Sequence, residues 1–190
     1  VLKALPQIGT AAEVTLVGNQ QELVKLSQQL QIPLGDYPLI DVPLGADQTL
    51  QLGQESSASG DLSFRSLQTA IRYCLKDGYD GVVTAPIAKS AWLAAGHHYP
   101  GQTELLAEMS AVSRFGMLFV ARSPLTQWTL CTLLATTHIP LREVPEALTP
   151  EVMTLKLELL LNCLRQDFGI ERPWVAIAGL NPHSGEQGQL

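Results

Sequence analysis

The sequence predicts a layered α/β fold, in which a largely parallel sheet is flanked by helices. Two observations lead to this prediction. Apolar segments of strand length alternate with helical segments along the chain, and several of these strands are apolar on both faces, as a parallel sheet covered by helices requires. The chain has 190 residues, of which 46% are hydrophobic, so it is large enough to bury a core of this kind.

The amino-terminal third contains two predicted strands with a helix between them. Residues 13–17 form a short β-rich segment, and residues 38–42 form the one plausible strand in a stretch that is otherwise interrupted by Pro and Gly. Residues 20–30 have helical periodicity. The apolar side chains near one face of this predicted helix are Leu23, Val24, Leu26 and Leu30.

The middle of the chain alternates between helix and strand more regularly. From Asp61 onward apolar residues recur at helical spacing, and Gly78 supplies a stop signal for the helix. A short strand is expected at residues 81–83. Two further helices follow it, at residues 88–95 and 103–110.

The carboxyl-terminal third combines one long helix with further strands. Thr149 and Pro150 form an N-cap followed by proline at the first helical position, and the helix they begin is expected to end near Gly169. The predicted strands of this third are residues 116–120, 128–134 and 174–178, the last of them buried.

Charge and cysteine content exclude several classes of protein. A net charge of −6, with scattered Lys and Arg, provides no broad positive surface for nucleic acid. Three widely spaced cysteines without a CxxC motif indicate neither a disulfide framework nor a cysteine zinc site, and they fit a reducing compartment. The apolar stretches are too short to cross a membrane. We therefore expect a soluble, cytoplasmic protein.

Chemically rich loops follow three of the predicted strands. Ligand sites in open α/β sheets lie beyond the carboxyl ends of the strands, so these loops are the first candidates for a site. His138 and His183 lie in two of them and could bind one divalent ion, because imidazole is a common metal ligand. Judged from the residues alone, the favoured interpretation is that both are ordinary loop histidines with satisfied hydrogen bonds.

Other polar residues admit a ligand-binding and an ordinary interpretation. Lys89 begins a predicted helix, whose amino terminus favours an anion such as phosphate, but a surface lysine would also fit there. Thr103 offers a hydroxyl at another helix start, where an N-cap role would explain it equally well. A GxGxxG motif is absent, so a dinucleotide would have to be bound by something other than the usual glycine-rich turn.

Four sequence blocks point to a known family. They are TAPIAKSAWLAAG, YPGQTELLAE, ATTHIPLREVPEALTP and AGLNPHSGEQG, in this order between residues 84 and 188. In order and spacing they resemble the signature blocks of the 4-hydroxythreonine-4-phosphate dehydrogenase family. The resemblance implies an isocitrate/isopropylmalate dehydrogenase-like fold. It also implies that residues 1–190 are a partial catalytic region truncated at both ends, without the family's amino-terminal glycine-rich block and carboxyl-terminal third.

The resemblance also implies an activity. In this family, 4-phosphooxy-L-threonine is oxidised with NAD and decarboxylated to 3-amino-2-oxopropyl phosphate, a step in the biosynthesis of pyridoxal 5′-phosphate. A divalent metal (Zn, Mg or Co) assists the reaction. The protein is expected to be a homodimer with a metal site shared between subunits, and its partner is a small phosphorylated hydroxy amino acid.

The resemblance assigns metal and substrate positions. His138 and His183 match two of the three metal-binding histidines of the family. Gln102 and Thr103 match two substrate-binding positions, although most members have histidine where this chain has Gln102. This departure leaves open a sister dehydrogenase that acts on 4-phospho-threonate or 4-phospho-erythronate.

Two further residues are assigned by the same blocks. Lys89 matches a lysine near the substrate and is the candidate catalytic residue, while Asn181 is the candidate cofactor contact. A non-catalytic fragment or interaction module is the alternative from a different class, because the resemblance implies that a third of the family's fold is missing.

Overall fold

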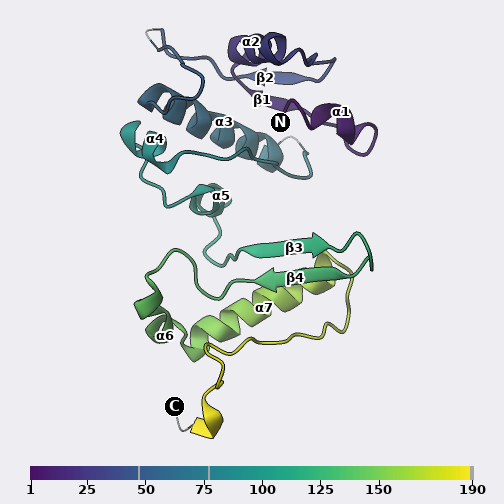
Figure 1. Cartoon of the computed structure of the whole chain (residues 1–190), viewed down its shortest axis with the longest axis vertical. Coiled ribbons are helices and arrows are strands. Elements are labelled where there is room, and N and C mark those ends of the chain that lie inside the picture. The colour runs from purple at the N-terminus through teal and green to yellow at the C-terminus, as the bar shows by residue number, and fades with distance from the viewer. Residues whose placement is uncertain (47, 77, 189–190) are drawn as a thin grey trace. The chain divides into compact units, whose positions relative to one another are not determined.

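The computed structural model of the chain describes residues 1–46, 48–76 and 78–188 (Figure 1). The chain forms two compact units, Val1–Val112 and Ser113–Leu190. Helices and parallel strands occur together, which confirms the predicted α/β class.

The first unit contains a parallel pair of strands between two helices. Strand β1 (Leu16–Gly18) pairs in parallel with β2 (Leu39–Asp41), and α2 (Gln20–Leu30) connects them. Two parallel strands need a crossover between them, and α2 provides it. Helix α2 lies beside β2 on one side of the pair, and α3 (Ser57–Lys76) lies against β1 on the other (Figure 1). The short α1 (Leu5–Ile8) packs at the amino-terminal end.

Buried Asn19 links the end of β1 to the start of α2. Its Oδ1 accepts a hydrogen bond from the backbone N–H of Glu22 at 3.0 Å, which caps the helix. Its Nδ2 donates to the carbonyl oxygen of Val42 at 3.1 Å, just beyond β2. One side chain therefore joins the helix start to both strand ends.

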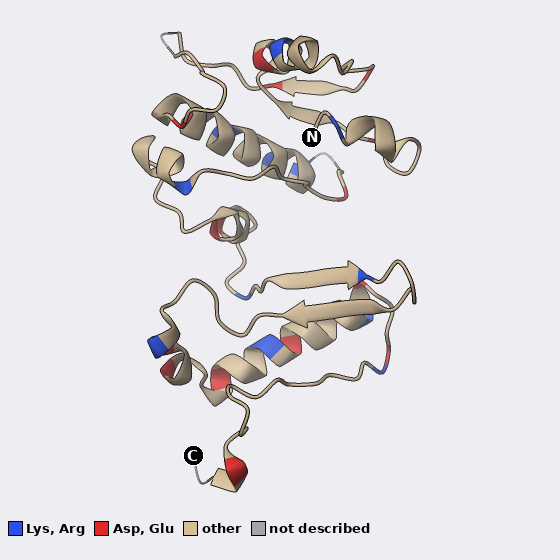
Figure 2. Cartoon of the chain, in the orientation of Figure 1, with Lys and Arg blue, Asp and Glu red and all other residues tan. Residues whose placement is uncertain are grey.

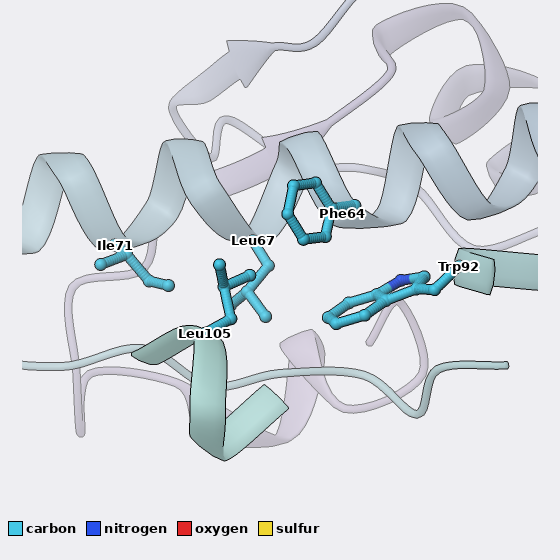
Figure 3. Close-up of a cluster of buried hydrophobic side chains, with 5 residues drawn as sticks. All are labelled: Phe64, Leu67, Ile71, Trp92 and Leu105. Atoms are coloured by element: carbon cyan, nitrogen blue, oxygen red, sulfur yellow. The ribbon is translucent and has the colours of Figure 1, made fainter. Parts of the chain in front are cut away.

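A second core of this unit lies between three helices. Helix α3 packs against α4 (Lys89–Ala94) and α5 (Gln102–Met109). The buried side chains that form this core, drawn in Figure 3, are Phe64, Leu67, Ile71, Trp92 and Leu105. They come from all three helices, so the core positions the starts of α4 and α5 relative to α3.

Helices α3 and α4 approach closely at a glycine. A Cβ atom on Gly60 would lie 2.0 Å from the carbonyl oxygen of Ala91, so the close contact depends on the missing side chain. Trp92 is fully buried beside this contact, and its Nε1 donates to Ser63 Oγ at 2.7 Å. Its ring meets that of Phe64 edge to face, with centroids 5.1 Å apart.

A charged network covers one side of this core. The His97 ring stacks on Phe64 at a centroid distance of 3.7 Å, and its Nε2 lies 3.1 Å from Asp61 Oδ1. Arg65 Nε donates to Asp61 Oδ2 at 2.7 Å. Burial raises the pKa of Asp61, but the hydrogen bonds from Arg65 and His97 outweigh it and hold the pKa below its usual value.

In the variant Asp61→Asn, stability is expected to fall less as the pH is lowered than it does in the wild type. A carboxylate with a lowered folded-state pKa stabilises the fold above its unfolded pKa of about 3.9, and this contribution disappears as the pH falls through the folded value. The variant should therefore be less stable than the wild type at neutral pH, with a flatter decline below about pH 4. Urea unfolding at a series of pH values measures both effects. The control is Asp36→Asn at an exposed turn, and identical acid profiles for Asp61→Asn and wild type would contradict the prediction.

The second unit combines a hairpin with the long helix. Strands β3 (Leu118–Arg122) and β4 (Thr129–Leu133) pair antiparallel, and α7 (Pro150–Gln166) follows. Thr149 caps this helix as predicted, because its Oγ1 accepts from the backbone N–H of Val152 at 3.3 Å. The shorter elements of the unit are η1 (Leu141–Glu143), α6 (Val144–Ala147) and η2 (Glu186–Gly188).

Polar contacts tie α7 to the segment before β3. Lys156 Nζ donates to the carbonyl oxygen of Phe115 at 3.0 Å, and Arg114 forms an ion pair with Glu158. Leu164 on α7 is 6% exposed and is the buried hydrophobic residue of the described part of this unit. Exposed ion pairs add little to the stability of a fold, so the described part of this unit is stabilised mainly by its few buried contacts.

Two predicted strands are wrong. Residues 81–83 and 174–178 pair with no other described segment, and Val83 and Trp174 are 98% and 100% exposed. Their apolar composition is typical of buried strands, yet a strand also needs a hydrogen-bonding neighbour. The other predicted strands and helices are confirmed, with ends that differ by a few residues.

The antiparallel β3–β4 pair departs from the parallel order that the sequence suggested for the sheet. Only residues 123–128 separate these two strands. A parallel connection needs a crossover of about a dozen residues or more, so a connection this short allows only a hairpin.

Charged residues are distributed over several elements of each unit. Figure 2 shows Lys and Arg on helices, strand ends and loops, with Asp and Glu interspersed. None of the described helices combines the length and the apolar character needed to cross a membrane.

Candidate functional site

Two predicted ligand-binding segments of the first unit meet at Gln102. Its Oε1 accepts a hydrogen bond from Thr84 Oγ1 at 2.7 Å, and its Nε2 donates to the carbonyl oxygen of Ala85 at 3.0 Å. The loop after residues 81–83 is thereby joined to the first residue of α5. The amide of Gln102 is engaged at both ends by protein groups.

Lys89 and Thr103 lie close to this junction. Lys89 is the exposed first residue of α4, and its Nζ would lie 4.0 Å from a Cβ built on Gly101. It forms no hydrogen bond or ion pair with the part of the chain that the structure describes. Thr103 is not the N-cap of α5, because Gly101 occupies that position without a side-chain cap. The three substrate-side candidates, Lys89, Gln102 and Thr103, therefore occupy one region of this unit.

His138 and His183 both belong to the second unit. His138 is exposed and has a positive φ of 57°, so it sits at a left-handed turn. The His183 side chain is 61% exposed, and its Nδ1 lies 2.5 Å from Glu186 Oε1. A carboxylate beside one ring nitrogen fixes the tautomer and leaves the other nitrogen available.

Asn181 shapes the loop that carries His183. Its Oδ1 accepts hydrogen bonds from the backbone N–H groups of His183 at 2.9 Å and Ser184 at 3.1 Å. An asparagine that bonds the backbone two and three residues ahead is a common turn device. The cofactor contact predicted for Asn181 stays a prediction beside this local role.

The donor set of the second unit fits a metal ion in part. Metal-binding histidines usually hydrogen-bond a carboxylate through the nitrogen that does not bind the metal, as His183 does with Glu186. Within residues 1–46, 48–76 and 78–188, however, no three His, Cys, Asp or Glu side chains gather closely enough to hold an ion. A site built on these histidines needs a ligand from outside that set.

Sequence reasoning missed two carboxylates at these sites. Glu186 follows His183 by three residues, and the turn between them brings the two side chains together. Glu104 is the third residue of α5, where acidic side chains turn back toward the helix start. Their spacing from His183 and from the predicted helix start could have identified them from the sequence.

Comparison with known proteins gives consistent matches over the whole chain. The model of the family described as "Pyridoxal phosphate biosynthetic protein PdxA" matches residues 3–190. A protein of Synechocystis sp. named 4-hydroxythreonine-4-phosphate dehydrogenase is 56% identical over 200 residues, which cover 100% of this chain and 57% of that protein. A protein of Nostoc sp. with the same name is 54% identical over 202 residues, covering 100% and 56%. The chain thus spans a little more than half the length of these relatives.

Solved structures agree with these matches. A structure titled as a putative 4-hydroxythreonine-4-phosphate dehydrogenase from Salmonella typhimurium has a TM-score of 0.83 at 28% identity, covering 98% of this chain and 61% of that one. The 4-hydroxythreonine-4-phosphate dehydrogenase of Klebsiella pneumoniae has a TM-score of 0.69 at 35% identity, covering 80% and 45%. The isopropylmalate dehydrogenase-like architecture expected from the sequence is compatible with both.

Proposed function

The chain belongs to the family of the pyridoxal phosphate biosynthetic protein PdxA, and from this premise we propose that it acts in a 4-hydroxythreonine-4-phosphate dehydrogenase. The proposed reaction is the NAD-dependent oxidation and decarboxylation of 4-phosphooxy-L-threonine to 3-amino-2-oxopropyl phosphate in the cytoplasm. The main support is 56% identity to a relative of that name over all of this chain.

The proposed substrate-binding residues lie in the first unit. Lys89 would bind an anionic group of the substrate through its ammonium, and Thr103 would donate a hydrogen bond from its hydroxyl. The bonds of Gln102 to Thr84 and Ala85 support this arrangement, because they hold the loop and the start of α5 together. The amino terminus of α5 also favours a negative group.

His138 and His183 are the proposed metal ligands. A divalent ion held there would supply Lewis acidity toward the substrate hydroxyl oxygen, and NAD would accept the hydride. The Glu186 carboxylate would orient the His183 ring. A third ligand from beyond the described residues, in a homodimer whose subunits share the site, would complete the coordination.

A sister dehydrogenase is the second candidate. Its substrate would be 4-phospho-threonate or 4-phospho-erythronate, which lack the amino group of 4-phosphooxy-L-threonine. Gln102 favours it, because a neutral amide replaces a side chain that titrates near neutral pH and so changes the charge beside the substrate.

One assay separates these candidates. The protein made from its complete reading frame is incubated with NAD and each phosphorylated substrate in turn, and the formation of NADH and carbon dioxide is followed. Turnover of 4-phosphooxy-L-threonine well above that of 4-phospho-threonate and 4-phospho-erythronate supports the proposal. Preference for either of these two compounds supports the sister enzyme. No turnover of any of the three supports the non-catalytic alternative.

The substitution Gln102→His is expected to be tolerated. A neutral imidazole has one donor and one acceptor nitrogen and can keep one of the two bonds, so KM should change by less than about threefold. Steady-state kinetics on the preferred substrate measure this. Gln102→Ala is the comparison, because it removes both bonds and should raise KM more. A collapse of substrate binding in Gln102→His would mean that the amide recognises a different ligand.

A further inference from the structure

Glu104 has a shielded carboxylate oxygen without a partner. Its Oε2 is inaccessible to solvent and accepts no hydrogen bond from the described residues. A buried carboxylate oxygen without a donor is unfavourable, so such an atom usually has a functional or a ligand-dependent partner. Glu104 lies in the first turn of α5, where the helix dipole stabilises its negative charge without supplying that donor.

A cationic donor without a partner among the described residues, the ammonium of Lys89, lies on the same side of the helix start. A Cβ atom on Gly101 would lie 3.4 Å from Glu104 Oε2, 3.9 Å from Lys89 Cε and 4.0 Å from Lys89 Nζ. Carboxylate and ammonium therefore face the same small space, which exists because residue 101 has no side chain. They are too far apart in this structure to form an ion pair.

Other polar side chains of α5 already have partners. Glu108, one turn further along the helix, accepts a hydrogen bond from Tyr99 Oη at 3.0 Å. Gln102 is held by Thr84 and Ala85, as described above. The shielded oxygen of Glu104 and the ammonium of Lys89 are the complementary groups that these contacts leave free in the described part of this region.

We propose that Glu104 is a positioning residue for Lys89: its shielded carboxylate oxygen attracts the ammonium across the space beside Gly101 and holds it at the start of α5. The consequence of this pairing rests on the proposed function: Lys89 would meet the anionic substrate from a fixed position. The lysine side chain is long and flexible, so its rotation can carry the ammonium toward the carboxylate.

The first test measures the pairing without any substrate. The protein is treated with acetic anhydride, and the rate of acylation at Lys89 is followed by mass spectrometry, with Lys25 as the internal reference. Glu104→Gln keeps the size of the side chain and removes its charge, so Lys89 should react about threefold faster than in the wild type. Glu108→Gln is the matched control on the same helix and should leave Lys89 unchanged. An unchanged rate in Glu104→Gln overturns the proposal.

The second test separates positioning from a structural role. In the complete enzyme, Glu104→Gln should raise KM about fivefold with a smaller change in kcat, and the same substitution should have no further effect on KM in a Lys89→Ala background. An equal effect in both backgrounds would show that Glu104 acts independently of Lys89 and would overturn the proposal. Absence of turnover in the wild type would instead contradict the proposed function, while the acylation test would still decide the pairing.

Discussion

Replacing either His138 or His183 by alanine is expected to abolish metal-dependent turnover while leaving the fold intact. Each substitution would remove one of the proposed imidazole ligands, and losing a ligand should reduce activity by at least about a hundredfold, since even loss of a residue that only supports a ligand costs 10–100-fold. The fold should survive because both side chains are exposed, His183 by 61%. The measurements are kcat in the complete enzyme, bound metal by elemental analysis, and circular dichroism.

The matched control for the two histidines is His98→Ala. His98 is an exposed loop histidine of the first unit, outside the proposed metal site, so its replacement should leave metal content and turnover near the wild-type values. Normal activity and metal content in either His138→Ala or His183→Ala would refute the assignment of that residue. Loss of activity with full metal content would point to a role in substrate binding.

Gly60→Ala is expected to be the most destabilising small substitution in the first unit. Alanine in place of glycine inside a helix usually stabilises by about 0.5–1 kcal/mol. Here the added Cβ would lie 2.0 Å from the carbonyl oxygen of Ala91 and 2.9 Å from the backbone nitrogen of Trp92, and neither atom belongs to a flexible side chain. Helices α3 and α4 must separate and loosen the packing of Trp92, so we expect a net loss of about 3 kcal/mol.

Chemical denaturation, followed by tryptophan fluorescence, measures the effect of Gly60→Ala. The control is Gly81→Ala, because a Cβ there would meet nothing within 4 Å and the backbone does not have a positive φ. That variant should keep nearly the wild-type stability. Equal midpoints for Gly60→Ala and wild type would mean that α3 and α4 adapt to the methyl group without loss of packing.

Local sequence signals located most of the elements. Thr149 and Pro150 marked the start of α7 correctly, and the side chain of Thr149 caps the helix as its position implied. The α2 periodicity gave both ends of that helix. Capping and periodicity involve residues within about four positions of each other, so they can be recognised without knowledge of the fold.

Sequence patterns located the candidate site only in part. The resemblance singled out Lys89, Gln102 and Thr103, and the structure places them in one region of the first unit. The resemblance did not predict that Thr84 and Ala85 would form hydrogen bonds with the side-chain amide of Gln102. Hydrogen bonds between residues 17 and 18 positions apart depend on the fold rather than on local spacing.

What the sequence by itself determined is the α/β class, the positions of the main helices, and membership of a family through four ordered blocks. The tertiary structure alone decided that residues 174–178 have no described strand partner, that Asp61 lies beside His97, and that an oxygen of Glu104 is shielded without a donor. The physical reason is the separation along the chain between the residues that interact. Helix periodicity and caps arise between near neighbours in the chain, whereas strand pairing, burial and charge partners are set by residues that only folding brings together.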